Sequence, residues 1–181
     1  MNNIGTKTIE TKRLVLRRFT EEDAKEIYEG YVNQEGFLYY ANKEKRTLQE
    51  EINSLKGIED KYNNLEYYNW LITIKDTKKV IGAIHLNVDN YNESVEFNYA
   101  IDDRYQCKGY MTEALEAVKN YCLNEIKVNR IFGGCEINNI ASKKVMEKCS
   151  FIYEGTLRKH LKLKDGYHDM CIYSIVRDDK K

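Results

Sequence analysis

The stretch RYQCKGYMTEAL, residues 104–115, joins a basic turn to the start of a helical pattern. Its first nine residues contain Arg104, Lys108 and Gly109 but no acid. A strand is expected to end at Ile101 and a helix to open at Gly109, an order that presents unpaired backbone N–H groups to an anion. Glycine leaves room for a ligand, and the helix dipole favours negative charge. The stretch is a candidate phosphate-binding turn, although spacing alone favours a plain structural turn.

Two common nucleotide-binding patterns are absent. The sequence lacks the GxxxxGK[ST] pattern of a P-loop. Gly109 has no glycine two positions before it and no suitably placed acid after it, so the dinucleotide-binding fingerprint is also missing. The nucleotide kinase and dehydrogenase classes therefore lose their main support.

The region before the turn changes from a helical period to a strand period. Residues 14–19 are predicted as a strand, followed by a helix that Thr20 caps, with Asp23 in the third position. Apolar residues along one face predict a second helix over residues 46–62. Alternating apolar residues then predict an antiparallel meander of three strands, over residues 68–74, 80–88 and 95–101.

The region after the turn begins with a strong amphipathic pattern that predicts a helix from about Gly109 to Lys127. A strand over 130–137 and a short helix capped by Asn138 or Asn139 follow. Two closing strands are expected, joined by a turn at Asp165-Gly166. The order β-α-α-β-β-β-α-β-α-β-β, with about seven strands, predicts one mixed α/β domain over residues 1–181.

Composition and charge limit the class of protein. The 181 residues, 42% of them apolar, suffice for one domain with a core. Lysine plus arginine equals aspartate plus glutamate at 29 each, so the basic excess of a nucleic-acid binder is absent. The apolar runs are short and no signal-type segment is found. We therefore expect a cytoplasmic protein with no nucleic-acid partner and no membrane span.

The cysteines and histidines do not form a metal-binding pattern. Five scattered cysteines without a CxxC pair argue against a disulfide framework and a zinc knuckle. The three histidines form neither HxxxH nor HExxH. We expect reduced thiols and no metal site.

The turn itself resembles the pyrophosphate-binding motif [QR]-x-x-G-x-[GA] of GNAT N-acetyltransferases, through Gln106 and Gly109. Three further segments agree with the branch of this family that contains Rim-type ribosomal-protein N-terminal acetyltransferases. These segments are TKRLVLRRFTEEDA at 11–24, NNIASKKVMEKCSFIYEGTLR at 138–158 and DGYHDMCIYSI at 165–175. The chain departs from the family at Cys107 and Ser150, where glycine is usual, and at Met111, where a small residue is usual.

The resemblance implies a GNAT fold, with a mixed, largely antiparallel sheet flanked by helices, and the use of acetyl-CoA as acetyl donor. The expected donor site comprises the end of the third meander strand, the turn and the start of the short helix. The strand is expected to separate from the next strand there and offer free backbone groups, and a bulge near Asn98 is expected to aim an N–H at the thioester oxygen. The residues assigned to this site are Ala100, Ile101, Gln106, Cys107, Lys108, Gly109, Tyr110, Met111, Asn139 and Ser142.

The same resemblance suggests groups that handle the two protons of acetyl transfer. Glu96 matches a frequent carboxylate and is the candidate base, with a solvated strand acid as the alternative. Many GNAT enzymes protonate the leaving thiolate with a tyrosine, but Met146 occupies that place. Ser142 is the candidate acid, with a first-turn serine bonded to the backbone as the alternative, and Tyr173 is the reserve candidate.

The acceptor is expected to be a primary amine bound beside residues 37–62, which carry both acids and aromatic residues. The branch resemblance favours the N-terminal amine of a ribosomal or other protein. A polyamine or an aminoglycoside is the first alternative. A non-catalytic acetyl-CoA sensor is the second, because Met146 replaces the usual acid. A homodimer is left open.

Overall fold

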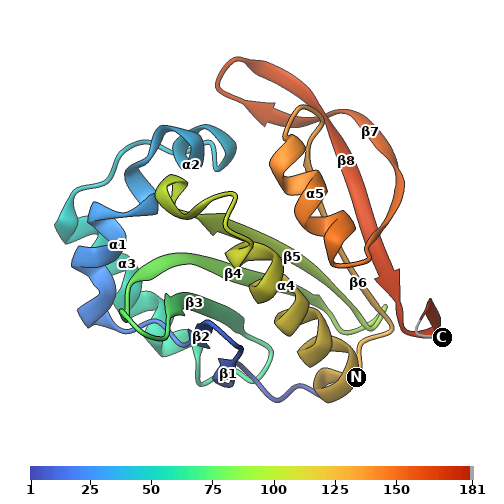
Figure 1. Cartoon of the computed structure of the whole chain (residues 1–181), viewed down its shortest axis with the longest axis horizontal. Coiled ribbons are helices and arrows are strands. Elements are labelled where there is room, and N and C mark those ends of the chain that lie inside the picture. Colours follow the sequence, from blue (N-terminus) through green and yellow to red (C-terminus); the bar gives the residue numbers. More distant parts are fainter. Residues whose placement is uncertain (180–181) are drawn as a thin grey trace.

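Eight strands form one mixed sheet in the computed structural model, which describes residues 1–179 (Figure 1). Their order across the sheet is β1-β2-β3-β4-β5-β6-β8-β7. Neighbouring strands are antiparallel except for β5 and β6, which are parallel. The strands are β1 (Ile9–Glu10), β2 (Leu14–Arg17), β3 (Tyr68–Ile74), β4 (Val80–Asp89), β5 (Ser94–Ile101), β6 (Arg130–Glu136), β7 (Ile152–Leu163) and β8 (Gly166–Val176).

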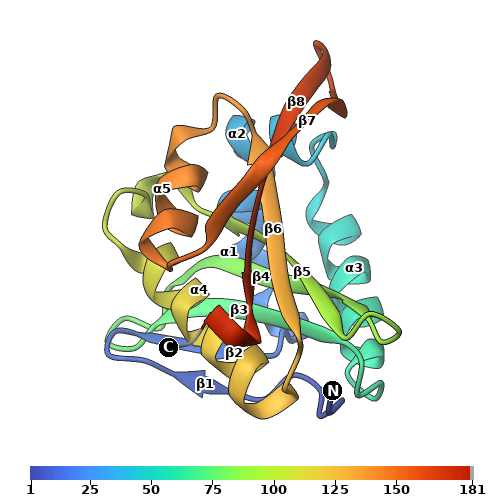
Figure 2. The same cartoon turned by 90° about the vertical axis from the view of Figure 1, so that its right-hand side faces the viewer.

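Five α-helices cover the two faces of this sheet in the described part of the chain. Figure 2 shows α4 and α5 on one face and α1 and α3 on the other. The helices are α1 (Ala24–Glu29), α2 (Glu35–Tyr40), α3 (Leu48–Lys61), α4 (Tyr110–Tyr121) and α5 (Ile140–Lys148). This arrangement confirms the expected mixed fold with a largely antiparallel sheet.

The predicted element order holds, with two additions and one shorter helix. The two-residue strand β1 and the six-residue helix α2 were not expected, because neither is long enough to show a period. The amphipathic helix runs from Tyr110 only to Tyr121, and Cys122–Ile126 form a π-helical turn. The apolar pattern continues through that turn, so the sequence could not show where the hydrogen bonding changes.

The two faces of the sheet bury separate apolar clusters. Met111, Leu115 and Val118 of α4 pack against strand residues that include the fully buried Trp70. Ile27 of α1 and Leu55 of α3 belong to the other cluster. Each of these fully buried side chains contributes roughly 1.5–3 kcal/mol to folding, so both helix layers are fixed firmly on the sheet.

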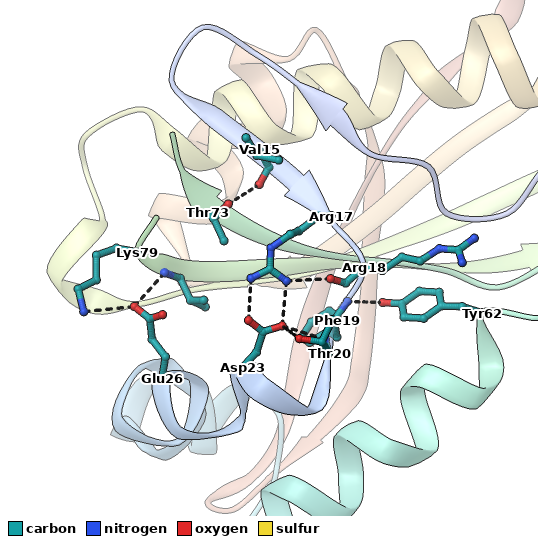
Figure 3. Close-up of polar contacts among 11 residues, drawn as sticks. Val15, Arg17, Arg18, Phe19, Thr20, Asp23, Glu26, Tyr62, Thr73 and Lys79 are labelled. Atoms are coloured by element: carbon teal, nitrogen blue, oxygen red, sulfur yellow. Dashed lines mark hydrogen bonds and ion pairs between the residues drawn. The ribbon is translucent and has the colours of Figure 1, made fainter. Parts of the chain in front are cut away.

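The link between β2 and α1 is held by an ion pair at the predicted helix cap (Figure 3). Arg17 donates to both carboxylate oxygens of Asp23, at 2.8 and 2.6 Å, and the backbone N–H of Thr20 donates to the same carboxylate at 2.8 Å. Burial alone would raise the pKa of Asp23, but the hydrogen bonds from Arg17 and Thr20 outweigh it and hold the pKa below its usual value. The cap predicted at Thr20 and Asp23 is therefore confirmed.

Two absences concern residues 1–179 only. None of their helices is both long and apolar enough to cross a membrane. No group of three or more histidine, cysteine, aspartate and glutamate side chains is arranged there to hold a metal ion. The five cysteines are free thiols.

Candidate active site

The strands β5 and β6 pair over only three positions, from Ser94 opposite Arg130 to Glu96 opposite Phe132. Beyond Glu96 the two strands diverge, which Figure 2 shows at the centre of the sheet. The predicted separation of these strands is therefore confirmed. It leaves the last residues of β5 without a partner strand on one side.

The direction of the free backbone groups follows from the pairing of β5 with β4. The N–H of Asp102 donates to the carbonyl of Ile81 at 2.8 Å, so alternate residues before it, including Ala100, direct their backbone groups toward β4. Tyr99 and Ile101 consequently direct theirs into the divergence. Two β5 residues were assigned to the donor site. Ile101 offers free backbone groups there, whereas the backbone of Ala100 is paired with Ala83, so the assignment of Ala100 was wrong.

The bulge expected at Asn98 is absent. The register between β4 and β5 runs without a break from Gly82 opposite Ile101 to Asp89 opposite Ser94, and Asn98 lies opposite His85. Asparagine tolerates unusual backbone angles but does not require them, and Asn98 does not have a positive φ. The prediction was wrong, and Tyr99 supplies the N–H that faces the divergence nearest to Asn98.

The turn before α4 has the geometry of an anion site. Gly109 caps the helix with a φ of 76°, a left-handed conformation that glycine adopts without strain. The first bond that closes a helical turn runs from the Glu113 N–H to the Gly109 carbonyl at 3.1 Å. The N–H groups of Tyr110, Met111 and Thr112 therefore have no acceptor within the helix. Gln106, Cys107, Lys108 and Gly109 are exposed, while the side chain of Met111 is buried in the core.

The two cations of the turn are tied to the turn itself. Arg104 donates through two nitrogens to the carboxylate of Asp102, which is fully buried. The ammonium of Lys108 donates to the Arg104 carbonyl at 2.8 Å. Burial raises the pKa of Asp102, but the hydrogen bonds from Arg104 and Gln34 outweigh it and the pKa lies below its usual value. Both cations thus shape the turn, and an anion there would rely mainly on backbone N–H groups.

The start of α5 lies across the divergence from β5. Asn139 caps this helix by accepting from the Ser142 N–H at 3.0 Å, which settles the choice between Asn138 and Asn139. The hydroxyl of Tyr99 donates to Ser142 Oγ at 3.0 Å and to the Ser142 carbonyl at 3.3 Å. Burial raises the pKa of Tyr99 well above its usual value, so its hydroxyl stays protonated. Because Ser142 Oγ accepts this proton, its own hydroxyl proton is available to another group.

Tyr99 was missed by the sequence interpretation, which placed it within the strand predicted over residues 95–101 and gave it no role in the site. A signal was present, because its hydroxyl is the one polar group on the face formed with Val95, Phe97 and Ile101. The usual tyrosine place, Met146, is buried with 1% of its surface exposed. Tyr99 therefore supplies a phenol next to α5, but it comes from strand β5, whereas the usual tyrosine would come from α5 itself.

Tyr173, the reserve acid, is directed elsewhere. Its hydroxyl donates to Glu147 Oε1 at 3.2 Å, and in the described residues it makes no hydrogen bond with Ser142 or Tyr99. Burial, followed by the hydrogen bond to Glu147, raises the pKa of Tyr173 to about 12. Tyr173 is thus a weaker candidate than Ser142 for proton transfer at the divergence.

Glu96 lies at the last position where β5 pairs with β6. Its side chain is on the opposite face of the sheet from Tyr99 and Ser142. It is half-buried and accepts from the Asn87 side-chain amide at 3.2 Å. The candidate base and the candidate acid are therefore on different faces, with the divergence between them. A reacting group held in that divergence could lose a proton on one face and gain one on the other.

An open groove of about 950 Å³ lies between α3 and the strands β3 and β4 on the Glu96 face. Asn87, which binds Glu96, belongs to its lining. Most of the lining carries amide, hydroxyl or charged groups, and includes Asn53, Ser54, Lys61, Asn64, Glu66, Asn69 and His85. Helix α3 comes from the region 37–62, which was expected to lie beside the acceptor, and that expectation stays a prediction.

A second polar cluster joins α2 to the β7–β8 turn and the end of β6. The hydroxyl of Tyr39 donates to Asp165 at 2.9 Å. His168 contacts Asp165 through Nε2 at 2.9 Å and Glu136 through Nδ1 at 3.4 Å. Partial burial lowers the pKa of His168, but the two carboxylates outweigh it and raise the pKa above its usual value. The sequence interpretation assigned no role to these residues, which come from distant segments.

Residues 13–152 match the model of the Acetyltransferase (GNAT) domain. The uncharacterized N-acetyltransferase YoaA of Bacillus subtilis is 28% identical over 170 residues, covering 93% of this chain and 96% of that protein. The ribosomal-protein-serine acetyltransferase of Escherichia coli is 24% identical over 178 residues, covering 97% of this chain and 99% of that protein.

Two solved structures share the fold. A GNAT-family acetyltransferase from Bacillus anthracis superposes with a TM-score of 0.83 at 23% identity, covering 95% of this chain and 99% of that one. The ribosomal L7/L12 alpha-N-protein acetyltransferase RimL, solved in complex with coenzyme A, has a TM-score of 0.79 at 18% identity, covering 95% of this chain and 99% of that one.

Proposed function

The chain belongs to the GNAT acetyltransferase family, and on that premise we propose that it transfers the acetyl group of acetyl-CoA to the N-terminal amine of a ribosomal or other protein. One observation carries the proposal: β5 and β6 separate beside a helix start with three unpaired N–H groups. An extended donor with a diphosphate at one end needs both features. RimL, which shares the fold, has been solved in complex with coenzyme A, and this supports acetyl-CoA as the donor.

The donor is held in three parts in this proposal. Its diphosphate lies on the backbone of residues 106–111, where the helix dipole favours negative charge. Its pantetheine amides pair with the free backbone groups of Tyr99 and Ile101, as an added strand would. The thioester then lies near the Tyr99 and Ser142 hydroxyls.

The reaction forms a C–N bond and breaks a C–S bond. The neutral amine attacks the thioester carbonyl after the ammonium proton has moved to Glu96, directly or through a water. The tetrahedral intermediate collapses and the thiolate leaves, taking the hydroxyl proton of Ser142. Tyr99, already a donor to Ser142 Oγ, stabilises the negative charge that forms on this oxygen. The attacking nitrogen loses its second proton as the amide forms, and this proton restores the Ser142 hydroxyl directly or through a water. The first proton passes from Glu96 to solvent, so the protons balance.

The choice of a peptide acceptor rests on the groove beside Glu96. Its amide and hydroxyl side chains can donate to and accept from peptide groups, which suits a main chain better than an apolar ligand. The ribosomal-protein-serine acetyltransferase relative adds support through its named acceptor. A polyamine carries several ammonium groups, whereas Glu66 is the one carboxylate among the described residues that line the groove, which also contains Lys61.

A mass-spectrometric panel tests the acceptor. Peptides with free N-termini, polyamines and aminoglycosides are incubated with acetyl-CoA, and each peptide is matched with a copy whose N-terminus is already acetylated. We expect acetylation of free N-termini and none of the blocked copies. Efficient acetylation of a polyamine or an aminoglycoside, with peptides unmodified, would contradict the peptide assignment while leaving the donor site in place.

A further inference from the structure

The turn before α4 must keep a fixed shape if it is to bind the diphosphate of the donor, and contacts from outside the turn can provide this. Among the described residues, the hydrogen bonds of its own cations, Arg104 and Lys108, go to Asp102 and to the Arg104 carbonyl, both within the turn. A turn of exposed residues with two positive φ values, at Cys107 and Gly109, needs further support to keep a fixed shape. That support comes from a residue far away in the sequence.

Arg13, immediately before β2, contacts this turn directly. Its Nη1 donates to the Lys108 carbonyl at 3.0 Å, and its guanidinium lies 4.4 Å from the centre of the Tyr110 ring. Its Nη2 lies beside Gly109, 3.5 Å from where a Cβ on that residue would be. Arg13 therefore reaches three consecutive residues of the proposed diphosphate turn.

The same side chain is fixed at its other end by Glu113, one turn into α4. Arg13 Nε donates to Glu113 Oε2 at 2.6 Å, and the Arg13 backbone N–H donates to Oε1 at 2.8 Å. Thr11 Oγ1 also donates to Oε1 at 2.6 Å. Burial would raise the pKa of Glu113, but the hydrogen bonds from Thr11 and Arg13 outweigh it and hold the pKa below its usual value, so the carboxylate stays charged.

These contacts form a fork that only an arginine can make. One guanidinium edge binds the carboxylate of Glu113 and another binds the Lys108 carbonyl, and lysine has no planar group that could do both. The fork joins the turn to the first turn of α4 and to the segment before β2. It thereby fixes the direction of the unpaired N–H groups between them.

We propose that Arg13 is a positioning residue of the donor site, which holds the turn at 106–111 in the shape that binds the diphosphate of acetyl-CoA. The inference rests on the proposed function. Arg13 acts through the backbone of the turn, and the reacting atoms are remote from it. Its loss should therefore weaken binding of the diphosphate and leave the acetyl-transfer step unchanged.

The test compares two donors, acetyl-CoA and S-acetylpantetheine, which carries the same thioester without the diphosphate. In Arg13→Ala, kcat/KM for acetyl-CoA should fall about ten-fold or more, the effect of losing one hydrogen bond from a charged group. The fall should appear in KM, with kcat little changed. The kcat/KM for S-acetylpantetheine should stay at the wild-type value, because this donor does not use the turn.

Arg18→Ala is the matched control. Arg18 also donates to a backbone carbonyl, that of Thr6 at 3.0 Å, and also lies over a tyrosine ring, Tyr62, at 5.0 Å. It makes no contact with the turn among the described residues, so its loss should not change the ratio between the two donors. Arg13→Lys keeps the positive charge and most of the aliphatic side chain, so it can replace Arg13→Ala if the alanine variant does not fold. It should lose acetyl-CoA efficiency nearly as far as Arg13→Ala.

Three outcomes would overturn the inference. An equal fall for both donors would mean that Arg13 only stabilises the fold. Full activity of Arg13→Lys with acetyl-CoA would mean that charge, and not the fork, is what matters. A wild-type enzyme that uses both donors equally well would remove the diphosphate site itself, and would contradict the proposed donor binding as well.

Discussion

The hydroxyl of Tyr99 on β5 lies 3.0 Å from the hydroxyl of Ser142 on α5, and the two residues bridge the place where β5 and β6 diverge. This pair connects the strand that would hold the donor to the helix that carries the candidate acid. It places a protonated phenol behind the serine, so the serine hydroxyl can give up its proton without becoming an isolated buried anion.

Removing the serine hydroxyl should slow acetyl transfer. Ser142→Ala is expected to lower kcat by roughly ten-fold, less than is usual for general-acid assistance, because a thiolate is a tolerable leaving group. Tyr99→Phe should cost less, and the double variant should be no slower than Ser142→Ala, since the tyrosine acts through the serine. Steady-state rates measure this, with Tyr153→Phe as a control from an exposed tyrosine. Additive losses would show that the two hydroxyls act separately.

Glu96→Gln should slow the reaction most at pH values below the pKa of the acceptor amine. There the amine arrives as an ammonium ion and needs a base, whereas above its pKa the neutral amine is already present. Glutamine keeps the size of the side chain and a hydrogen-bonding oxygen for Asn87. A pH–rate profile should show partial rescue as the pH rises. A loss that is the same at every pH would remove Glu96 from the base role.

Two departures from the family pattern fall on backbone positions with positive φ. Cys107 has a φ of 58° and Ser150 a φ of 64°, which explains why glycine is usual at both places. Cys107→Gly and Ser150→Gly should each raise the free energy of unfolding by about 1 kcal/mol, measured by denaturant titration. Gln106→Gly is the matched control, because Gln106 has a φ of −64° and should lose stability. If the free energy of unfolding rises in neither variant, the backbone at these two positions is not strained.

The pKa values of two histidines should shift in opposite directions, that of His168 because of its two carboxylates and that of His85 because of its burial. The pKa of His168 should lie above its ordinary value of 6.5, and that of the partly buried His85 below it. The contacts of charged His168 with Asp165 and Glu136 should therefore stabilise the link to α2 at acidic pH, and weaken as the pH rises through the raised pKa. An NMR titration of the imidazole signals measures both values.

Asp165→Asn should lower the pKa of His168, because it removes the nearer carboxylate. Asp169→Asn is the control, since Asp169 accepts from the backbone N–H of Lys159 and not from His168. An unchanged His168 pKa in Asp165→Asn would show that the cluster does not form in solution.

The parts of the site that sequence could predict are those set by neighbours in the chain. The caps at Thr20 and Asn139 and the turn at Gly109 depend on residues within a few positions, and all three are found. The hydrogen bond between Tyr99 and Ser142 joins residues 43 positions apart, and that between Arg13 and Lys108 spans 95. Such contacts depend on how the strands and helices pack, which no local pattern contains.

The error at Asn98 has a different cause. The family resemblance suggested a bulge, and asparagine was compatible with one, but a residue type that permits a conformation does not impose it. The pairing of β4 with β5 decided the backbone instead, because an unbroken ladder satisfies every hydrogen bond of that edge.

Donor binding at the turn and acetyl transfer are tested together by following both products of the reaction in the wild type, Gly109→Gln and Gly109→Glu. Both variants place a side chain at a left-handed position and should lose about 1–2 kcal/mol of stability, but only glutamate sets a negative charge against the diphosphate. With an accepted amine, we expect one free CoA thiol for each acetylated acceptor in the wild type, reduced turnover in Gly109→Gln, and no acetyl-CoA binding or turnover in folded Gly109→Glu. Wild-type affinity for acetyl-CoA in Gly109→Glu, or tight binding by the wild type without any acetylated product, would contradict this expectation.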